Sequence, residues 1–361
     1  MTEPDGSAAL VDWDLAVAAG VRLVRPGPQL PREDARAAVS QLRDLAIEAR
    51  SHVRSYSRLD APAADAPVAV VDRTEWLRSN AEGIRHLLDP IAHRLVRAGT
   101  PGPLRAVGAR VTALELGGGL AWMSSKVLGQ YEMFPPGGPD GDRPGRLLLV
   151  APNIVQVEQE LDVDPDDFRM WVCLHEETHR VQFAAVPWLR GHLVDGISSL
   201  MGSIETDPAA VAERLRAAAV AVASAARGTD GPSLAEAVQT PEQRAQLDRL
   251  TAVMSLLEGH ADVVMDGVGP TVVPTVEQIR TAFQRRREHP GRAELAIRRL
   301  IGLDAKMRQY RDGAAFVRGV VDRVGMEGFN RVWDAPEMLP SAEEILDPQT
   351  WVDRAHGPAL A

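Results

Sequence analysis

The stretch Leu174-His175-Glu176-Glu177-Thr178-His179-Arg180 decides what the rest of the chain is built around. In a helix, residues four apart lie on one face with Cβ atoms roughly 5–6 Å apart, so the imidazole rings of His175 and His179 can converge on one ion. Glu176 is turned about 100° from His175, so its carboxylate can reach a water molecule on that ion without binding the ion. The spacing predicts a zinc site with His175 and His179 as ligands and Glu176 as general base.

The flanking residues indicate that this stretch is helical. Asp164 can cap a first turn, Pro165 suits the first helical position, and acids follow at 166 and 167. We expect the helix to run to about Ala185 and to stop before Pro187. An alternative is that both histidines are hydrogen-bonded core residues, because they share an apolar stripe of Phe168, Val172, His175, His179 and Phe183.

Two histidines leave a tetrahedral zinc site short of protein ligands. The best candidate for the third ligand is Glu258, which stands four positions before Asp262 and beside an apolar helical stripe. Asp262 is then expected to hold the outer nitrogen of a ligating histidine. A solvated acidic helix face is the alternative, and His260 is the competing ligand, although it lies well round the helix from Glu258.

The remaining sequence predicts an α+β fold that is predominantly helical. Helical periodicity covers residues 31–53, and capping boxes at Asp72 and Thr240 open two more helices. Strands are expected at 68–71, 127–134 and 146–151, the last two joined as a hairpin or as neighbours. Residues 1–105 are expected to form an N-terminal helical layer and residues 106–361 the catalytic core with a helical C-terminal part, either as two parts or as one continuous domain.

Composition narrows the class of protein. The net charge of −10 argues against a nucleic-acid or anionic-membrane surface as the main partner. One cysteine, Cys173, excludes an internal disulfide and fits a reducing compartment, and we expect it to be a small buried residue rather than a nucleophile. The N-terminus resembles no signal peptide, and the apolar run 217–226 is too short to span a bilayer. We therefore expect a soluble, cytoplasmic protein.

Other motifs carry less information. Gly117-Gly118-Gly119 lacks the lysine and hydroxyl residue of a phosphate loop and is expected to form a flexible turn. A hydrolase also needs an electrophile for the oxyanion, and no spacing rule selects one. The candidates are Tyr131, Arg180, His192, His260 and Tyr310, and for each a packing or surface role is the stronger interpretation.

The two motifs together, H-E-x-x-H at 175–179 and E-x-x-x-D at 258–262, resemble the gluzincin arrangement of thermolysin-type metallopeptidases, with a longer separation that implies an insertion. More closely, the chain resembles a bacterial family of zincin-like metalloproteases often labelled as associated with deazaflavin-cofactor biosynthesis. This resemblance implies a zincin-like core with a sheet edge beside the active helix. The segments that carry it are 11–14, 127–131, 150–153, 175–183, 186–189 and 306–310.

These observations lead to three hypotheses of function. The first is a zinc metallopeptidase, with a peptide lying extended along an edge strand near residues 146–151. The second is a zinc hydrolase that acts on a small amide or ester in a cofactor pathway. The third is a scaffold with a structural zinc ion, which the intact Glu176 argues against, because a structural site has no use for a carboxylate beside an open coordination position.

Overall fold

The computed structural model describes residues 10–61, 67–96, 102–134, 145–202, 240–288 and 303–357, without side chains at 90–96, 102–105, 287–288 and 303–311. The chain divides into two compact units. The first comprises Met1–Tyr56, Asp60–Ala185 and Val264–Phe283, and the second comprises Ser57–Leu59, Val186–Val263 and Gln284–Ala361. The catalytic core expected from residue 106 onward stays a prediction.

The sheet of the first unit has three described strands in the order β1-β3-β2. β1 (Val68–Val71) pairs parallel with β3 (Arg146–Val150), and β2 (Gly129–Glu132) pairs antiparallel with it. The expected pairing of the second and third strands is therefore confirmed. The expectation that residues 146–151 form an edge strand is wrong: β3 is the central strand, and its last four residues are buried. Among the described strands, β2 and β1 form the edges.

Helices cover both faces of this sheet, because successive side chains of a strand point to opposite sides. Leu148 and Val150 pack with Trp76 and Leu77 in one apolar cluster. On the other face, Tyr131 stacks on Phe183 with ring centroids 4.8 Å apart. The helices of the first unit are α1 (Trp13–Leu23), α2 (Arg32–Ser57), α3 (Arg73–Val96), α4 (Gly102–Met123), α5 (Ala151–Leu161), α6 (Pro165–Ala185), the end of α10 (Pro241–Val268) and most of α11 (Val276–Glu288).

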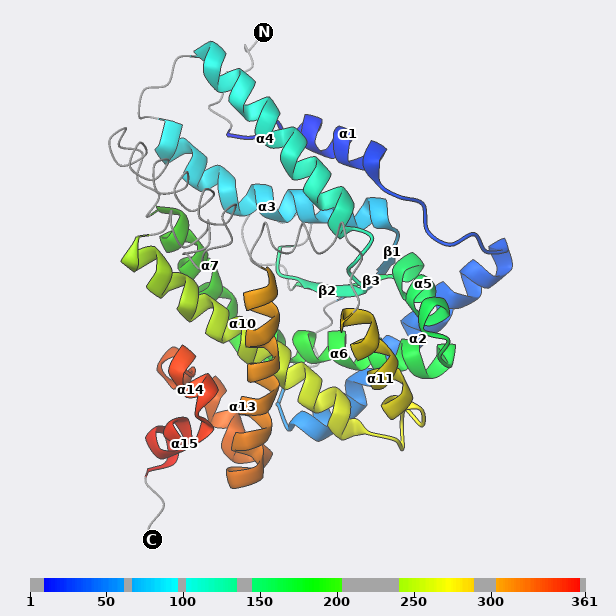
Figure 1. The fold of residues 1–361 in the computed structure, drawn as a ribbon, viewed down its shortest axis with the longest axis vertical. Coiled ribbons are helices and arrows are strands. Elements are labelled where there is room, and N and C mark those ends of the chain that lie inside the picture. Colours follow the sequence, from blue (N-terminus) through cyan, green and yellow to red (C-terminus); the bar gives the residue numbers. More distant parts are fainter. Residues whose placement is uncertain are drawn as a thin grey trace, which may run out of the picture. The chain divides into compact units, whose positions relative to one another are not determined.

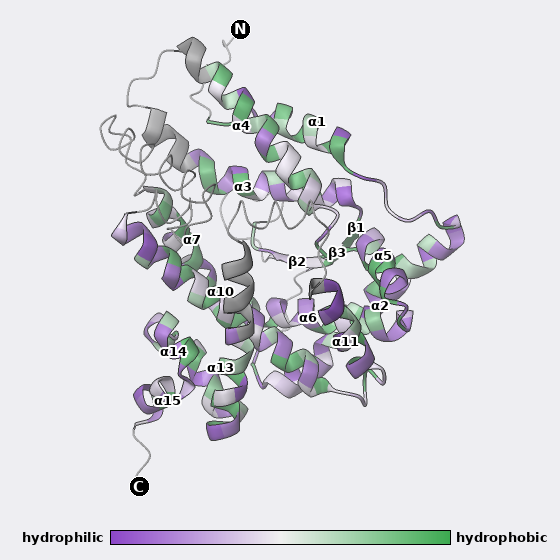
Figure 2. Cartoon of the chain, viewed as in Figure 1, coloured by the Kyte–Doolittle hydropathy of each residue, from purple (hydrophilic) through white to green (hydrophobic). Residues whose placement is uncertain are grey.

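The glycines at 117–119 lie inside α4, so the expected flexible turn is wrong. α1 and α4 run side by side (Figure 1), and Figure 2 shows apolar residues along both. A Cβ atom at Gly117 would lie 2.3 Å from the carbonyl oxygen of Ala16, so only glycine lets the two helices approach this closely. The glycine run therefore serves helix packing.

The second unit is helical in its described part. It contains α7 (Pro187–Gly202), most of α10, α13 (Leu303–Phe329), the short turns η1 (Asn330–Trp333) and η2 (Pro336–Met338), α14 (Ala342–Leu346) and α15 (Pro348–His356). α10 opens with the predicted capping box, in which Thr240 Oγ1 accepts from Gln243 N at 3.2 Å and Gln243 Oε1 accepts from Thr240 N at 3.0 Å. α10 and α13 touch through glycines: a Cβ atom at Gly259 would lie 2.2 Å from the carbonyl carbon of Gly313.

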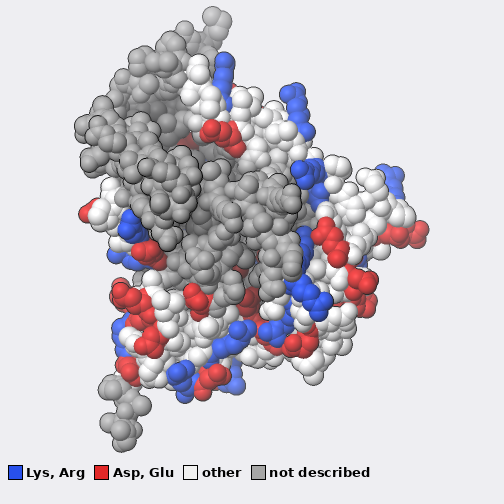
Figure 3. Space-filling model, in the orientation of Figure 1, with Lys and Arg blue, Asp and Glu red and all other residues white. Residues whose placement is uncertain are grey.

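The α+β, predominantly helical fold class is confirmed. No helix in the described ranges combines the length and the apolar composition needed to cross a membrane. On the face seen in Figure 3, basic and acidic side chains are interspersed over the described surface.

Two glycine substitutions on α4 test the packing role. Gly117→Ala is expected to lower the free energy of unfolding by about 1–3 kcal/mol, because the new methyl group overlaps the backbone of α1. Gly119→Ala is the matched control, since a methyl group added there would meet no described atom within 4 Å. It is expected to raise that free energy by roughly 0.5–1 kcal/mol through helix propensity. Urea unfolding of both variants measures the difference, and equal effects of the same sign would contradict this account.

Candidate metal site

α6 forms where the sequence predicted it. Asp164 Oδ1 accepts hydrogen bonds from the backbone N–H groups of Asp166 and Asp167, each at 3.0 Å, and so caps the first turn. The helix ends at Ala185, before Pro187 opens α7. The motif therefore lies in the middle of a capped helix, where its backbone geometry is fixed.

The two histidines converge as the spacing predicted. Their Nε2 atoms lie 3.3 Å apart, and their ring planes are inclined at 85°. A tetrahedral zinc ion with Zn–N bonds of roughly 2.0–2.1 Å needs ligand nitrogens about 3.3–3.4 Å apart. His175 and His179 thus already have the separation of two zinc ligands, and both side chains are half-buried rather than enclosed in the core.

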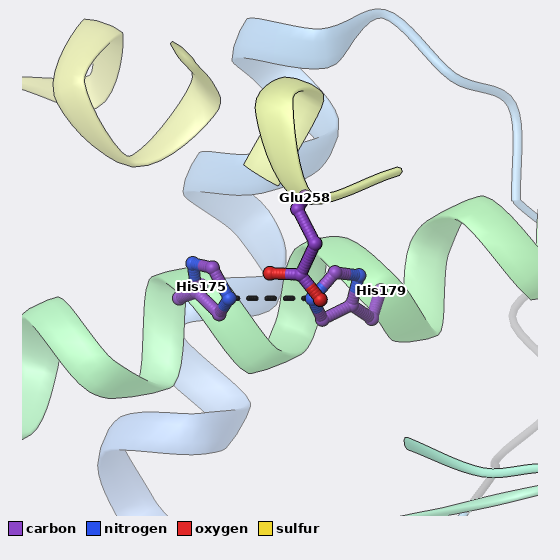
Figure 4. A group of neighbouring side chains, drawn as sticks. All are labelled: His175, His179 and Glu258. Atoms are coloured by element: carbon purple, nitrogen blue, oxygen red, sulfur yellow. Dashed lines mark hydrogen bonds between the residues drawn. The ribbon is translucent and has the colours of Figure 1, made fainter. Parts of the chain in front are cut away.

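Glu258 on α10 joins these histidines in one group (Figure 4). One ligand atom of each of the three residues lies within 4.8 Å of the others. Figure 4 shows the carboxylate of Glu258 directed toward the gap between the two rings. Two imidazoles and a carboxylate are a donor set that zinc takes in catalytic sites, so the group could hold a metal ion of this kind. Among the described residues, it is the one such group of three or more His, Cys, Asp or Glu side chains.

Glu176 is held beside the edge strand β2. Its side chain is buried, and a Cβ atom at Gly129 would lie 2.6 Å from both Cγ and Cδ of Glu176. Glycine at position 129 therefore lets the strand backbone close on the carboxylate. The expectation of a sheet edge beside the active helix is met by β2.

The second acid of the motif has a different role. Glu177 is fully buried, and its carboxylate accepts hydrogen bonds from Arg180, at 2.7 Å from Nε, and from Arg50, at 3.2 Å. Since Arg50 belongs to α2, this ion pair joins α6 to α2. Removal of either partner would leave an uncompensated buried charge and would be strongly destabilising. Arg180 is thus engaged in this ion pair, which makes it a poor candidate for the oxyanion electrophile.

The other candidates are distributed over the fold. His260 is fully buried and stacks on Phe329 at 5.2 Å, within an aromatic cluster of the second unit, so it is not part of the metal group. Tyr131 stacks on Phe183, and the ring of His192 packs edge-on against Trp188. The side chain of Tyr310 lies outside the described residues. None of these positions identifies an electrophile.

Two further expectations concern residues near the motif. Cys173 is fully buried, and burial, reinforced by the charges of Glu176 and Glu177, raises the pKa of its thiol far above the ordinary value. It is therefore a small core residue and not a nucleophile. Asp262 is half-buried on α10, and its expected contact with a ligating histidine stays a prediction.

Sequence reasoning missed one side chain at the site. Nδ1 of His179 lies 3.0 Å from the amide oxygen of Gln182, which is fully buried. The available signal was the spacing, because residues three apart on a helix are neighbours.

Comparison with known proteins bears on the family of the chain. No curated protein matches the chain significantly. A solved structure from Chloroflexus aurantiacus, described as a candidate hydrolase with a novel fold, is similar to it: 29% identity and a TM-score of 0.69, over 95% of this chain and 98% of that one. The family of zincin-like metallopeptidases matches residues 11–352. Since this match covers nearly the whole sequence, the chain belongs to the family of zincin-like metallopeptidases.

Proposed function

We propose that the chain is a zinc-dependent metallopeptidase in which His175, His179 and Glu258 hold one zinc ion and Glu176 is the general base. The observation that carries this proposal is the grouping of the three ligand atoms within 4.8 Å, with the two Nε2 atoms at 3.3 Å. A structural site would use four protein ligands, whereas the described residues supply three to this group, as in a catalytic site with a position for water or substrate.

When bound, the zinc ion supplies Lewis-acid chemistry, because it lowers the pKa of a water molecule toward roughly 7 and polarises a carbonyl group. Glu176 accepts the proton of the attacking water and passes it to the leaving amine. The close contact with Gly129 limits where this carboxylate can lie, so the base is positioned before substrate arrives. We assign no residue to the oxyanion.

An extended peptide fits the edge strand β2 better than any other described part of the sheet. Val150 N donates to Leu128 O at 2.8 Å, so Leu128 and Val150 form a hydrogen-bonded pair. In an antiparallel ladder the next pair, Gly129 and Leu149, is then not hydrogen-bonded, and the backbone N–H and C=O groups of Gly129 point away from β3. A substrate that adds as a further strand at this position would lie beside Glu176. This geometry favours a peptide over a small amide or ester, which would make no use of a strand edge.

Asp262 keeps its proposed role as an outer-sphere partner. Since Gln182 already bonds to the outer nitrogen of His179, the histidine left for Asp262 to orient is His175. The cytoplasmic location proposed from the single cysteine fits a peptidase with restricted access to its substrates, because unrestricted proteolysis there would be harmful.

Metal content tests the proposed ligands. The purified protein is expected to bind about one zinc ion per chain, and His175→Ala, His179→Ala and Glu258→Ala are each expected to lose most of it, because three ligands cannot be reduced to two without loss of affinity. Asp248→Ala is the matched control, an exposed acid on the same helix as Glu258. Elemental analysis measures the zinc content of each protein, and chelator competition measures its zinc affinity. Zinc binding by Glu258→Ala equal to that of the control would remove Glu258 from the site.

The general base is tested by Glu176→Gln. This variant is expected to keep its zinc and to lose about 10²–10⁴-fold in peptide hydrolysis, since only the proton acceptor is removed. A peptide-library digest of wild type against the variant measures the loss and reveals the cleavage preference. Cleavage at near-wild-type rate would move the base elsewhere. A wild type that binds zinc but cuts only small amides or esters would favour the cofactor-pathway hydrolase, and one with no hydrolysis at all would favour the scaffold.

Gly129→Ala tests the contact between β2 and the base. The added Cβ overlaps the Glu176 side chain and is expected to displace it, lowering turnover by about 10–100-fold while zinc binding stays unchanged. Gly83→Ala on α3 is the control, because its added methyl group would meet no atom of the described chain within 4 Å. If both variants retain full turnover, the position of Glu176 does not depend on β2.

A further inference from the structure

We propose that Gln182 is a positioning residue that fixes the tautomer and ring orientation of His179, so that Nε2 is presented to the metal. This inference rests on the proposed zinc site. The carrying observation is the 3.0 Å contact between Nδ1 of His179 and Oε1 of Gln182. The side chain of Gln182 is completely buried, three residues further along α6.

The chemistry of the contact selects one tautomer. The atom of Gln182 that faces the ring is the amide oxygen, which can only accept, so the contact is a hydrogen bond when Nδ1 carries the hydrogen. In a neutral imidazole the other nitrogen then has the lone pair. That nitrogen is Nε2, which lies 3.3 Å from Nε2 of His175 on the side of Glu258 (Figure 4). The hydrogen bond therefore leaves the metal-facing nitrogen free of its proton.

The complete burial of the Gln182 side chain limits its movement beside His179. Neighbouring polar side chains of α6 each bond to a separate partner on the helix: the Thr178 hydroxyl donates to Leu174 O at 2.8 Å, and Arg180 pairs with Glu177. These two bonds involve other atoms than the contact between Gln182 and His179. The contact with His179 thus comes from a residue of its own helix.

Three variants test the role. Gln182→Met removes the acceptor at similar volume and is expected to weaken zinc binding by roughly 10–100-fold, the usual effect of losing an outer-sphere partner. Gln182→Glu keeps an acceptor oxygen, and its zinc dissociation constant is expected to stay within about threefold of the wild-type value. Thr178→Val is the matched control, because it removes a buried hydroxyl next to His179 that bonds to the helix backbone. Chelator-competition titration measures the zinc dissociation constants of wild type and the three variants.

A second measurement reads the tautomer directly. Imidazole ¹⁵N chemical shifts of the zinc-free protein, assigned through His179→Asn, are expected to show the Nδ1–H form in wild type and Gln182→Glu, and a shift toward Nε2–H in Gln182→Met. An Nε2–H form in wild type would overturn the proposal, as would a Gln182→Met protein with unchanged zinc affinity. If wild type bound no zinc, the proposed function would fail, and the ¹⁵N shifts would still decide whether Gln182 sets the tautomer.

Discussion

The 3.3 Å approach of the two histidine nitrogens is the interaction on which the site depends, and it requires the motif to be helical and held in place within α6. The Asp164 cap secures the start of the helix. The buried pair of Glu177 and Arg180, joined by Arg50, ties its middle to α2. Because these contacts leave α6 little freedom, the two imidazoles face one another with the separation of zinc ligands.

Close approaches at three glycines fix distances between elements of the fold. Gly129 lets the edge strand β2 touch Glu176, and Gly117 lets α1 and α4 pack closely within the same unit. Gly259, directly after Glu258, lets α10 pack on α13. In each case the missing Cβ atom decides the separation, since a methyl group would overlap backbone or a functional side chain. Glycine at these positions therefore acts as a packing residue and not as a source of flexibility.

The proposed peptidase assigns a separate task to each layer of the site. The imidazoles and Glu258 form the metal group, Glu176 handles the proton, and β2 offers a strand edge to the substrate. By proposal, Gln182 and Asp262 orient the histidine rings, Gln182 through its contact with His179. This division explains why one helix carries almost all of the chemistry, while the surrounding elements fix distances.

The sequence by itself determined the local features: the helix around the H-E-x-x-H motif, its cap at Asp164 and the capping box at Thr240, because these depend on contacts within four residues. It also predicted three strands and pointed to Glu258, which the structure groups with His175 and His179. Only the tertiary structure decided that β3 is central and β2 the edge, that Gly117 lies in a helix, and that His260 belongs to an aromatic cluster. Strand order and glycine packing depend on residues far apart in the chain, whose pairing no local pattern encodes.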